Sequence, residues 1–150
     1  MKNTTSRALI LLLFLLIPVA AMAQVAASTS PTPTDPKADA LKAAEAWLAL
    51  LDAGQFPQSW DTAAPVLQKA VAKDNWGTAV QSARGPFGKL QSRKLESAEL
   101  TTSLPGAPAG QYVVAQYGTT FENHAAVETV TAMLDTDGQW RVAGYYVHGR

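Results

Sequence analysis

The C-terminal part of the chain alternates apolar and polar residues with the period of two that is typical of half-buried β-strands. Val130, Ala132 and Leu134 alternate with Thr129, Thr131 and Met133. After residues 135–138 a second alternation begins, and one of its faces carries Trp140, Val142, Gly144 and Tyr146. The two segments therefore predict a β-hairpin at the end of the chain.

The length of the turn decides which faces of this hairpin meet. A two-residue Asp137-Gly138 loop would place Leu134 opposite Arg141 and send the two apolar sets to opposite faces. A three-residue turn over residues 136–138, with Gly138 in the left-handed conformation, pairs Leu134 with Trp140 instead. We predict the three-residue turn. It continues the pairing as Ala132 with Val142, Val130 with Gly144 and Glu128 with Tyr146.

The segment between Asp35 and Gly54 has the period of an amphipathic helix. Asp35 is a suitable N-cap before Pro36 in the first turn, and Gly54 is a suitable left-handed C-terminal residue. We expect this helix to lie against the sheet because it is the most apolar helix of the mature chain. Its apolar stripe consists of Leu41, Ala44, Leu48 and Leu51, widened by Trp47 and Leu50.

Two further helical regions precede the strands. The first has the stripe Trp60, Ala64, Leu67 and Val71, and Pro65 predicts either a kink or a fresh helix start within it. Asp74 is the expected cap of the next helix, which ends at Gly85-Pro86. The expected inward residues of that helix are Trp76, Ala79 or Val80, and Ala83.

The pattern becomes strand-like after the last helix. Leu90 and Leu95 are out of phase, which predicts a bulge near Arg93 that bends the first strand. Residues 104–110 form a proline- and glycine-rich loop. The second strand carries one apolar face, with Val113, Ala115, Tyr117 and Phe121. Three helices followed by four strands predict an α+β domain, with the helices packed on one face of a curved antiparallel sheet.

The N-terminus has the layout of a secretory signal peptide over residues 1–23. Lys2 and Arg7 supply positive charge, residues 8–17 form an apolar core, and Ala21-Met22-Ala23 is a small-x-small cleavage site. The core is too short to cross a bilayer, so we expect cleavage after Ala23 and no stable membrane anchor. The mature protein is expected to be periplasmic or secreted, and the absence of cysteine excludes disulfides.

The mature chain divides into a linker and one domain. Residues 24–36 are rich in proline, serine and threonine and predict a disordered linker, and residues 37–150 form a single domain. Loss of the signal peptide leaves ten basic against twelve acidic residues, which does not favour nucleic acid as a partner. His124 and His148 stand apart, so neither a metal site nor a cofactor is expected.

Basic residues gather where the last helix meets the first strand: Arg84, Lys89, Arg93 and Lys94. They could bind an anion, but ion pairs to Glu96 and Glu99 on a solvated rim are the commoner outcome for such a cluster. The tryptophans could form a binding wall, but each lies on the inward stripe of its element, which predicts core packing for Trp47, Trp60, Trp76 and Trp140.

Glu128 is the most unusual residue, because the predicted register places its carboxylate on the inner face of the sheet. A buried charge must be paired, protonated or exposed at a cleft. The first interpretation is a structural ion pair with Arg84 or Arg93, and the second is a catalytic acid in a pocket. Glu128 is therefore the candidate catalytic residue, and Arg84, Arg93 and Tyr146 are the candidate binding residues.

Several runs of the chain stand out together: Ala46-Trp47-Leu48-Ala49-Leu50-Leu51-Asp52-Ala53-Gly54, Ser59-Trp60-Asp61, Arg84-Gly85-Pro86-Phe87-Gly88, Val127-Glu128-Thr129-Val130 and Gly138-Gln139-Trp140-Arg141-Val142-Ala143-Gly144-Tyr145. In this order they resemble one known family, the domain of unknown function 4019 (DUF 4019). The resemblance implies a small exported bacterial protein with no assigned activity. By analogy it also implies a cone-like fold similar to the nuclear-transport-factor-2/ketosteroid-isomerase or cystatin classes.

These observations favour an exported binding or interaction module without enzymatic activity. The alternative is a small-molecule lyase or isomerase that uses Glu128 in a cone-shaped pocket. A homodimer formed through the outer face of the sheet, where Tyr145, Val113 or its neighbours could be exposed, is a further candidate for the assembly.

Overall fold

The computed structural model describes residues 35–150. The predicted signal peptide and the linker as far as residue 34 lie outside the described residues. The helices are α1 (Pro36–Asp52), α2 (Phe56–Asp61), α3 (Pro65–Ala70), α4 (Lys73–Arg84) and the short 3-10 helix η1 (Gly85–Phe87). The strands are β1 (Leu90–Thr101), β2 (Tyr112–Phe121), β3 (Ala125–Leu134) and β4 (Trp140–Gly149).

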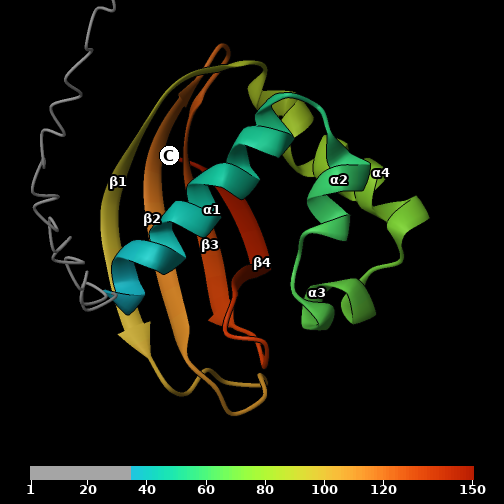
Figure 1. Ribbon diagram of the computed structural model, residues 1–150. Helices are drawn as coiled ribbons and strands as arrows, with labels where there is room; N and C mark the ends of the chain where they lie inside the picture. Colours follow the sequence, from blue (N-terminus) through green and yellow to red (C-terminus); the bar gives the residue numbers. More distant parts are fainter. Residues whose placement is uncertain (1–34) are drawn as a thin grey trace, which may run out of the picture. The chain divides into compact units, whose positions relative to one another are not determined.

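The strands form one antiparallel sheet in the order β1-β2-β3-β4, so each strand pairs with its neighbour in sequence. Figure 1 shows the curvature of this sheet, with α1 running diagonally across one face and α2, α3 and α4 gathered beside α1. The predicted α+β class, with helices on an antiparallel sheet, is confirmed.

The core lies between α1 and the sheet. Asp35 caps α1 by accepting a hydrogen bond from the Lys37 backbone N–H at 3.0 Å, and Gly54 follows the helix with a φ of +71°. The buried stripe of α1 packs on inward residues of the strands. On α1 the stripe is Ala40, Ala44, Trp47, Leu48 and Leu51, and on the sheet the partners include Ala115, Tyr117, Val130 and Val142.

The predicted number of helices changes at Pro65. A fresh helix starts there, one of the two outcomes that the sequence left open, and it separates α2 from α3. The described chain therefore has four α-helices where three were expected. Proline has no N–H to donate, so it is tolerated in the first turn of a helix and disrupts the interior.

The start of α4 also differs from the prediction. Asp74 is not the cap: Ala72 takes that position in an extended conformation, and Asp74 lies in the first turn. A carboxylate there still favours the positive end of the helix dipole. Trp76 and Val80 are buried as expected, but Ala83 is exposed, and the buried residue in the last turn is Arg84.

Two irregularities interrupt the pairing of β1 with β2, between Leu90 and Ser92 and between Leu95 and Ser97. They flank Arg93, close to the single bulge that the sequence predicted. Between them Arg93 pairs with Thr119, so its side chain lies on the inner face of the sheet.

The three-residue turn of the last hairpin is confirmed. Gly138 has a φ of +80°, and the Asp135 backbone N–H donates to the Gln139 carbonyl at 2.8 Å. Leu134 pairs with Trp140 and Ala132 pairs with Val142, as predicted.

The register beyond this point was predicted wrongly. A bulge in β4 at Ala143 shifts the pairing, so Val130 lies opposite Tyr145 and Glu128 lies opposite Val147. One extra residue in a strand exchanges the faces of the residues that follow it. The inward aromatic residue is therefore Tyr145 and not Tyr146.

Candidate functional site

A buried polar cluster lies on the inner face of the sheet and is centred on Glu128, whose side chain has no exposed surface. One carboxylate oxygen, Oε2, accepts hydrogen bonds from Arg93 Nε and from Thr119 Oγ1, both at 2.7 Å. The other, Oε1, accepts a hydrogen bond from the Tyr145 hydroxyl at 2.6 Å and lies 3.6 Å from Arg84 Nη2. Both oxygens are thus occupied by donors from β1, β2, β4 and α4.

Asp52 joins the two arginines of this cluster from the end of α1. Its Oδ1 accepts hydrogen bonds from Arg84 Nη2 at 2.5 Å and from Arg93 Nη2 at 3.0 Å. Its Oδ2 accepts a hydrogen bond from Arg93 Nη1 at 2.8 Å. Two guanidinium groups therefore face two carboxylates, and the cluster ties both helices to the sheet.

The position of Arg84 follows from the local sequence. It lies in the last turn of α4, where a cation is favoured by the negative end of the helix dipole. Its guanidinium carbon stands 5.2 Å from the centre of the Phe121 ring, within the range of a cation–π contact. Gly85 and η1 then turn the chain into β1, which carries Arg93.

These contacts shift the protonation equilibria of the cluster. Burial alone would raise the pKa of Asp52, but the hydrogen bonds and positive charges of Arg93 and Arg84 outweigh burial and lower it below its ordinary value. Burial alone would lower the pKa of Arg93, but its hydrogen bonds to Asp52 and Glu128 raise it. Burial and the negative charge of Glu128 raise the pKa of the Tyr145 hydroxyl.

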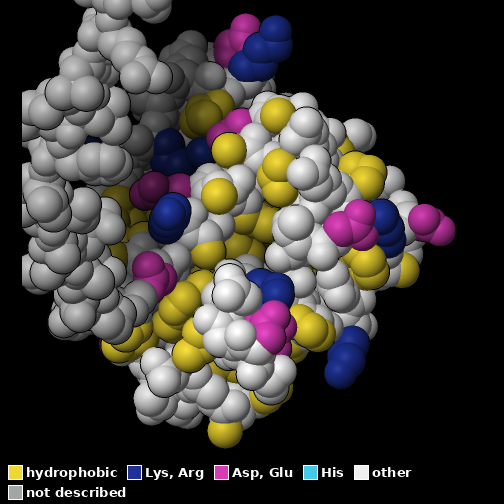
Figure 2. All heavy atoms as spheres, viewed as in Figure 1, with side chains coloured by type: hydrophobic (Ala, Val, Ile, Leu, Met, Phe, Trp, Pro, Cys, Tyr) yellow, Lys and Arg dark blue, Asp and Glu magenta, His cyan; other side chains and the backbone are white. Residues whose placement is uncertain are grey.

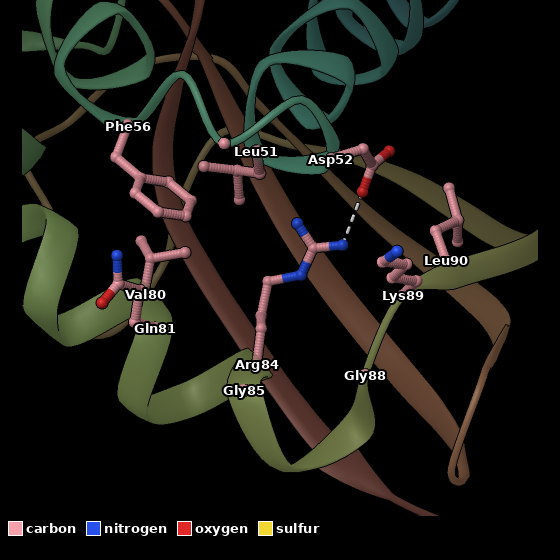
Figure 3. A pocket seen from close by; sticks show the side chains of 11 residues that line it. Leu51, Asp52, Phe56, Val80, Gln81, Arg84, Gly85, Gly88, Lys89 and Leu90 are labelled. Atoms are coloured by element: carbon pink, nitrogen blue, oxygen red, sulfur yellow. Dashed lines mark hydrogen bonds and ion pairs between the residues drawn. The ribbon is translucent and has the colours of Figure 1, made fainter.

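A cleft of about 570 Å³ opens beside Arg84, between the end of α1, α2, α4 and the start of β1. Figure 3 shows Arg84 rising from α4 toward Asp52. Apolar walls come from Leu51, Phe56, Val80 and Leu90. The residues with charged or amide side chains at its surface are Asp52, Gln81, Arg84 and Lys89, and Glu128 is not among the lining residues.

Arg84 keeps donors for this cleft. Within residues 35–150 its only hydrogen bond runs from Nη2 to Asp52, so its Nε and Nη1 have no partner there. Among side-chain polar atoms in this part of the chain, only the hydroxyl oxygen of Tyr117 is both fully buried and without a hydrogen-bond partner. Because the unpaired nitrogens of Arg84 are not in that state, they are accessible from the cleft or from solvent.

Tyr117 lies beside the cluster, in register with Glu128. Burial, followed by the negative charge of Glu45, raises the pKa of Tyr117 to about 12. Its hydroxyl therefore stays protonated at neutral pH. Tyr117 does not line the cleft and packs within the core.

The candidate residues from the sequence divide into two groups. Arg84, Arg93 and Glu128 come together, and the predicted ion pairing of Glu128 is present with both arginines. Tyr146 lies apart from them on the outer face of the sheet, 65% exposed and beside His148. Glu96, an expected partner of the basic cluster, pairs with Arg150 instead.

Sequence reasoning missed three members of the cluster: Asp52, Thr119 and Tyr145. Tyr145 was missed because of the bulge in β4. Asp52 carried a detectable signal, because a carboxylate in the last turn of a helix is disfavoured by the helix dipole unless cations compensate it. Thr119 carried no such signal, since threonine is ordinary in a strand.

Basic and acidic side chains are mixed on the face of the molecule that Figure 2 shows. In Figure 2, basic and acidic side chains are interspersed over the visible face of the described residues, and they form small groups of both signs. Within residues 35–150, no three His, Asp or Glu side chains gather as potential metal ligands. None of the helices in that range has the length and hydropathy needed to span a bilayer.

Residues 43–145, more than half of the chain, match the family model described as "Protein of unknown function (DUF4019)". The chain belongs to the DUF4019 family. A search of curated proteins finds no match. A solved 2.5 Å structure from Catenulispora acidiphila is similar, with 16% sequence identity and a TM-score of 0.46, covering 75% of this chain and 89% of the other.

Proposed function

We propose that this DUF4019 domain is an exported, non-enzymatic binding module whose ligand site is the cleft beside Arg84. The observation that carries the proposal is the combination of the 570 Å³ cleft, its four apolar side chains and a guanidinium group with unpaired donors. Small-molecule sites are clefts of this size with mostly apolar walls and a few fixed polar groups.

The ion-pair cluster supports this proposal because it holds Arg84 in place. Arg84 Nη2 donates to Asp52 Oδ1 at 2.5 Å and lies 3.6 Å from Glu128 Oε1. A donor that is already oriented loses little conformational entropy when a ligand arrives. The guanidinium that would bind the ligand is thus held in place before a ligand arrives.

The alternative is a lyase or isomerase that works through Glu128, and it has less support. A catalytic acid or base must reach the proton that it transfers. Glu128 does not line the cleft, and its two oxygens are occupied by Arg93, Thr119 and Tyr145. An enzyme of this kind would need the cluster to open before it could react.

The finer features of the proposal concern fold, location and assembly. The cone-like shape of the nuclear-transport-factor-2 class remains the analogy that we propose, since helices cover one face of a curved sheet. We place the mature protein in the periplasm or outside the cell, with residue 24 as its first residue. Homodimerisation would use the outer sheet face, where Tyr146 is exposed. Tyr145 and Val113, which the sequence suggested for that face, pack inward instead, Tyr145 against Trp47 and Val113 in the core.

The binding function is tested by looking for a retained ligand. The protein is purified from the periplasmic fraction and studied by native mass spectrometry, which also checks that the chain begins at Gln24. A bound small molecule is expected in the wild type and should be lost in Gln81→Trp, which fills the cleft from an exposed position on α4. Ser82→Trp, at an exposed neighbour outside the cleft, is the matched control and should retain the molecule.

A second arm of the experiment covers a ligand lost during purification. Thermal shifts with a metabolite library are compared between the wild type, Gln81→Trp and Ser82→Trp. Ligands that stabilise the wild type and Ser82→Trp but not Gln81→Trp support the cleft. No retained molecule and identical responses of all three proteins would refute the proposed site.

A further inference from the structure

The chemical class of the ligand can be read from the cleft, on the basis of the proposed function. Four apolar side chains line it, from α1, α2, α4 and β1: Leu51, Phe56, Val80 and Leu90. In Figure 3, Phe56 and Val80 stand on one side of Arg84, and Asp52 and Lys89 stand on the other. Gln81 accompanies Val80, and Leu90 accompanies Lys89. The charged side chains other than Arg84 thus lie at one end of the cleft, the end toward Phe56 and Val80 carries no charged side chain, and Arg84 lies between the two ends.

Arg84 presents its free donors at this boundary. In Figure 3 one terminal nitrogen is joined to Asp52, and the other points toward Leu51 and Phe56. The second nitrogen and Nε have no hydrogen-bond partner within residues 35–150. An arginine edge with free N–H groups matches the geometry of a carboxylate. A carboxylate bound there would leave the rest of its molecule against the apolar walls.

The charge balance points to one negative charge on the ligand. Arg84 and Arg93 are matched by Asp52 and Glu128, and both oxygens of Asp52 already accept from the arginines. Lys89 also lines the cleft, and its ammonium group has no ion-pair partner within the described residues. The lining residues and the cluster together therefore carry one uncompensated cation.

Glu122 is a carboxylate close to Lys89 that could compete for its charge. It accepts from the Lys89 backbone N–H at 3.5 Å, which is a marginal hydrogen bond, and it does not line the cleft. It forms no ion pair with the Lys89 ammonium group. The positive charge of Lys89 thus remains available at the charged end of the cleft.

We infer that the ligand is a small monocarboxylate with an apolar body, bound with its carboxylate on the free N–H groups of Arg84 and its apolar part against Phe56 and Val80, while Lys89 supplies the uncompensated positive charge of the cleft. The bound molecule completes the charge balance of the cleft. It also gives the free N–H groups of Arg84 an acceptor, and an apolar body suits the walls that the cleft offers.

The test compares three probes that share an eight-carbon chain and differ only in their polar group. A chain of this length fits within the volumes of about 300–1,000 Å³ that are usual for small-molecule sites. Octanoate, octanol and octylammonium are titrated into the purified protein by calorimetry. Octanoate is expected to bind at least about ten-fold more tightly than octanol, a difference of about 1.4 kcal/mol. Octylammonium should bind more weakly than either. Equal or tighter binding of octanol overturns the inference.

Two variants separate the carboxylate from the apolar body. Arg84 belongs to the ion-pair cluster, so the charge is changed at the exposed Lys89 instead. Lys89→Gln should weaken octanoate binding about two- to five-fold and leave octanol unchanged, because that factor is about 0.4–1 kcal/mol, within the range of an exposed charge pair. Lys94→Gln, at an exposed position on β1 outside the cleft, should change neither affinity. Equal effects of the two lysine variants also overturn the inference.

The outcomes distinguish the inference from the proposed function. Gln81→Trp should abolish binding of octanoate and of octanol, while Ser82→Trp should not. If octanol binds as tightly as octanoate and only Gln81→Trp abolishes binding, the cleft is a ligand site but the carboxylate preference is wrong. If none of the three probes binds, the inference is overturned, and the cleft itself then stands or falls on the retained-ligand and library experiments.

Discussion

Glu128→Gln is the most direct test of the buried cluster. The substitution keeps the shape of the side chain and removes its charge at a position without exposed surface. In the best orientation the amide oxygen replaces Oε2 and still accepts from Arg93 and Thr119. The amide nitrogen then faces the Tyr145 hydroxyl, which must turn to accept, and it also faces Arg84 Nη2 at the place of the 3.6 Å contact.

The magnitude follows from the charges that remain. After the substitution two buried guanidinium groups share one carboxylate, that of Asp52. Breaking a buried ion pair by removing one partner costs about 3–5 kcal/mol. We expect a value near the lower end, about 3 kcal/mol, because the glutamine retains an acceptor for Arg93. In a domain of this size that corresponds to a fall in melting temperature of roughly 10 °C.

The assay is urea denaturation at neutral pH, followed by tryptophan fluorescence and analysed by linear extrapolation. Glu99→Gln is the matched control, because Glu99 is exposed and has no ion pair within the described residues. The control should stay within about 0.5 kcal/mol of the wild type. If Glu128→Gln also stays within that range, the buried carboxylate is not needed to balance the arginines.

Three further predictions concern single residues. Asp52→Asn should lower the free energy of unfolding by about 2 kcal/mol at neutral pH. Because the folded pKa of Asp52 is lowered, its contribution is complete above the unfolded pKa of about 3.9 and is lost as the pH falls through the folded value, so the difference between the variant and the wild type should shrink as the pH falls below about 3.9. A difference that does not shrink on acidification would contradict the ionic role. Gly138→Ala should cost about 1 kcal/mol, measured by thermal denaturation, because Gly138 has a φ of +80°. Ser59→Ala should cost about 1–3 kcal/mol in urea, because the buried Ser59 hydroxyl accepts from Trp76 Nε1 at 2.9 Å; an unchanged midpoint would mean that water replaces it.

The parts of the fold that the sequence predicted well depend on local rules. The cap at Asp35, the buried stripe of α1 and the turn at Gly138 each follow from residues close together in the chain. The bulge in β4 does not follow from such a rule, because a bulge can form at many residue types. It was nevertheless decisive, since it exchanged Tyr145 for Tyr146 on the inner face.

Only the part of the site that follows from the cost of burying a charge could be predicted from the sequence. A carboxylate on an inner face needs a partner, and this requirement alone pointed from Glu128 to Arg84 and Arg93. Asp52 approaches Arg93 from 41 positions away in the sequence, so the pair depends on how α1 crosses the sheet. The way in which α1 crosses the sheet cannot be predicted from any short stretch of the sequence.

Under the proposed binding function, the charged cluster has a role that fold stability alone would not give it. A buried ionic group costs desolvation energy, and well-packed apolar residues of similar volume often stabilise a fold as well or better. Stability alone would therefore favour an apolar contact where α1 and α4 meet the sheet. Among residues 35–150, however, Arg84 is the only charged side chain that both lines the cleft and contacts Glu128, and an apolar replacement would remove it. The two carboxylates hold this guanidinium in one orientation with its free edge unpaired, and we attribute the retention of charge in the core to that function.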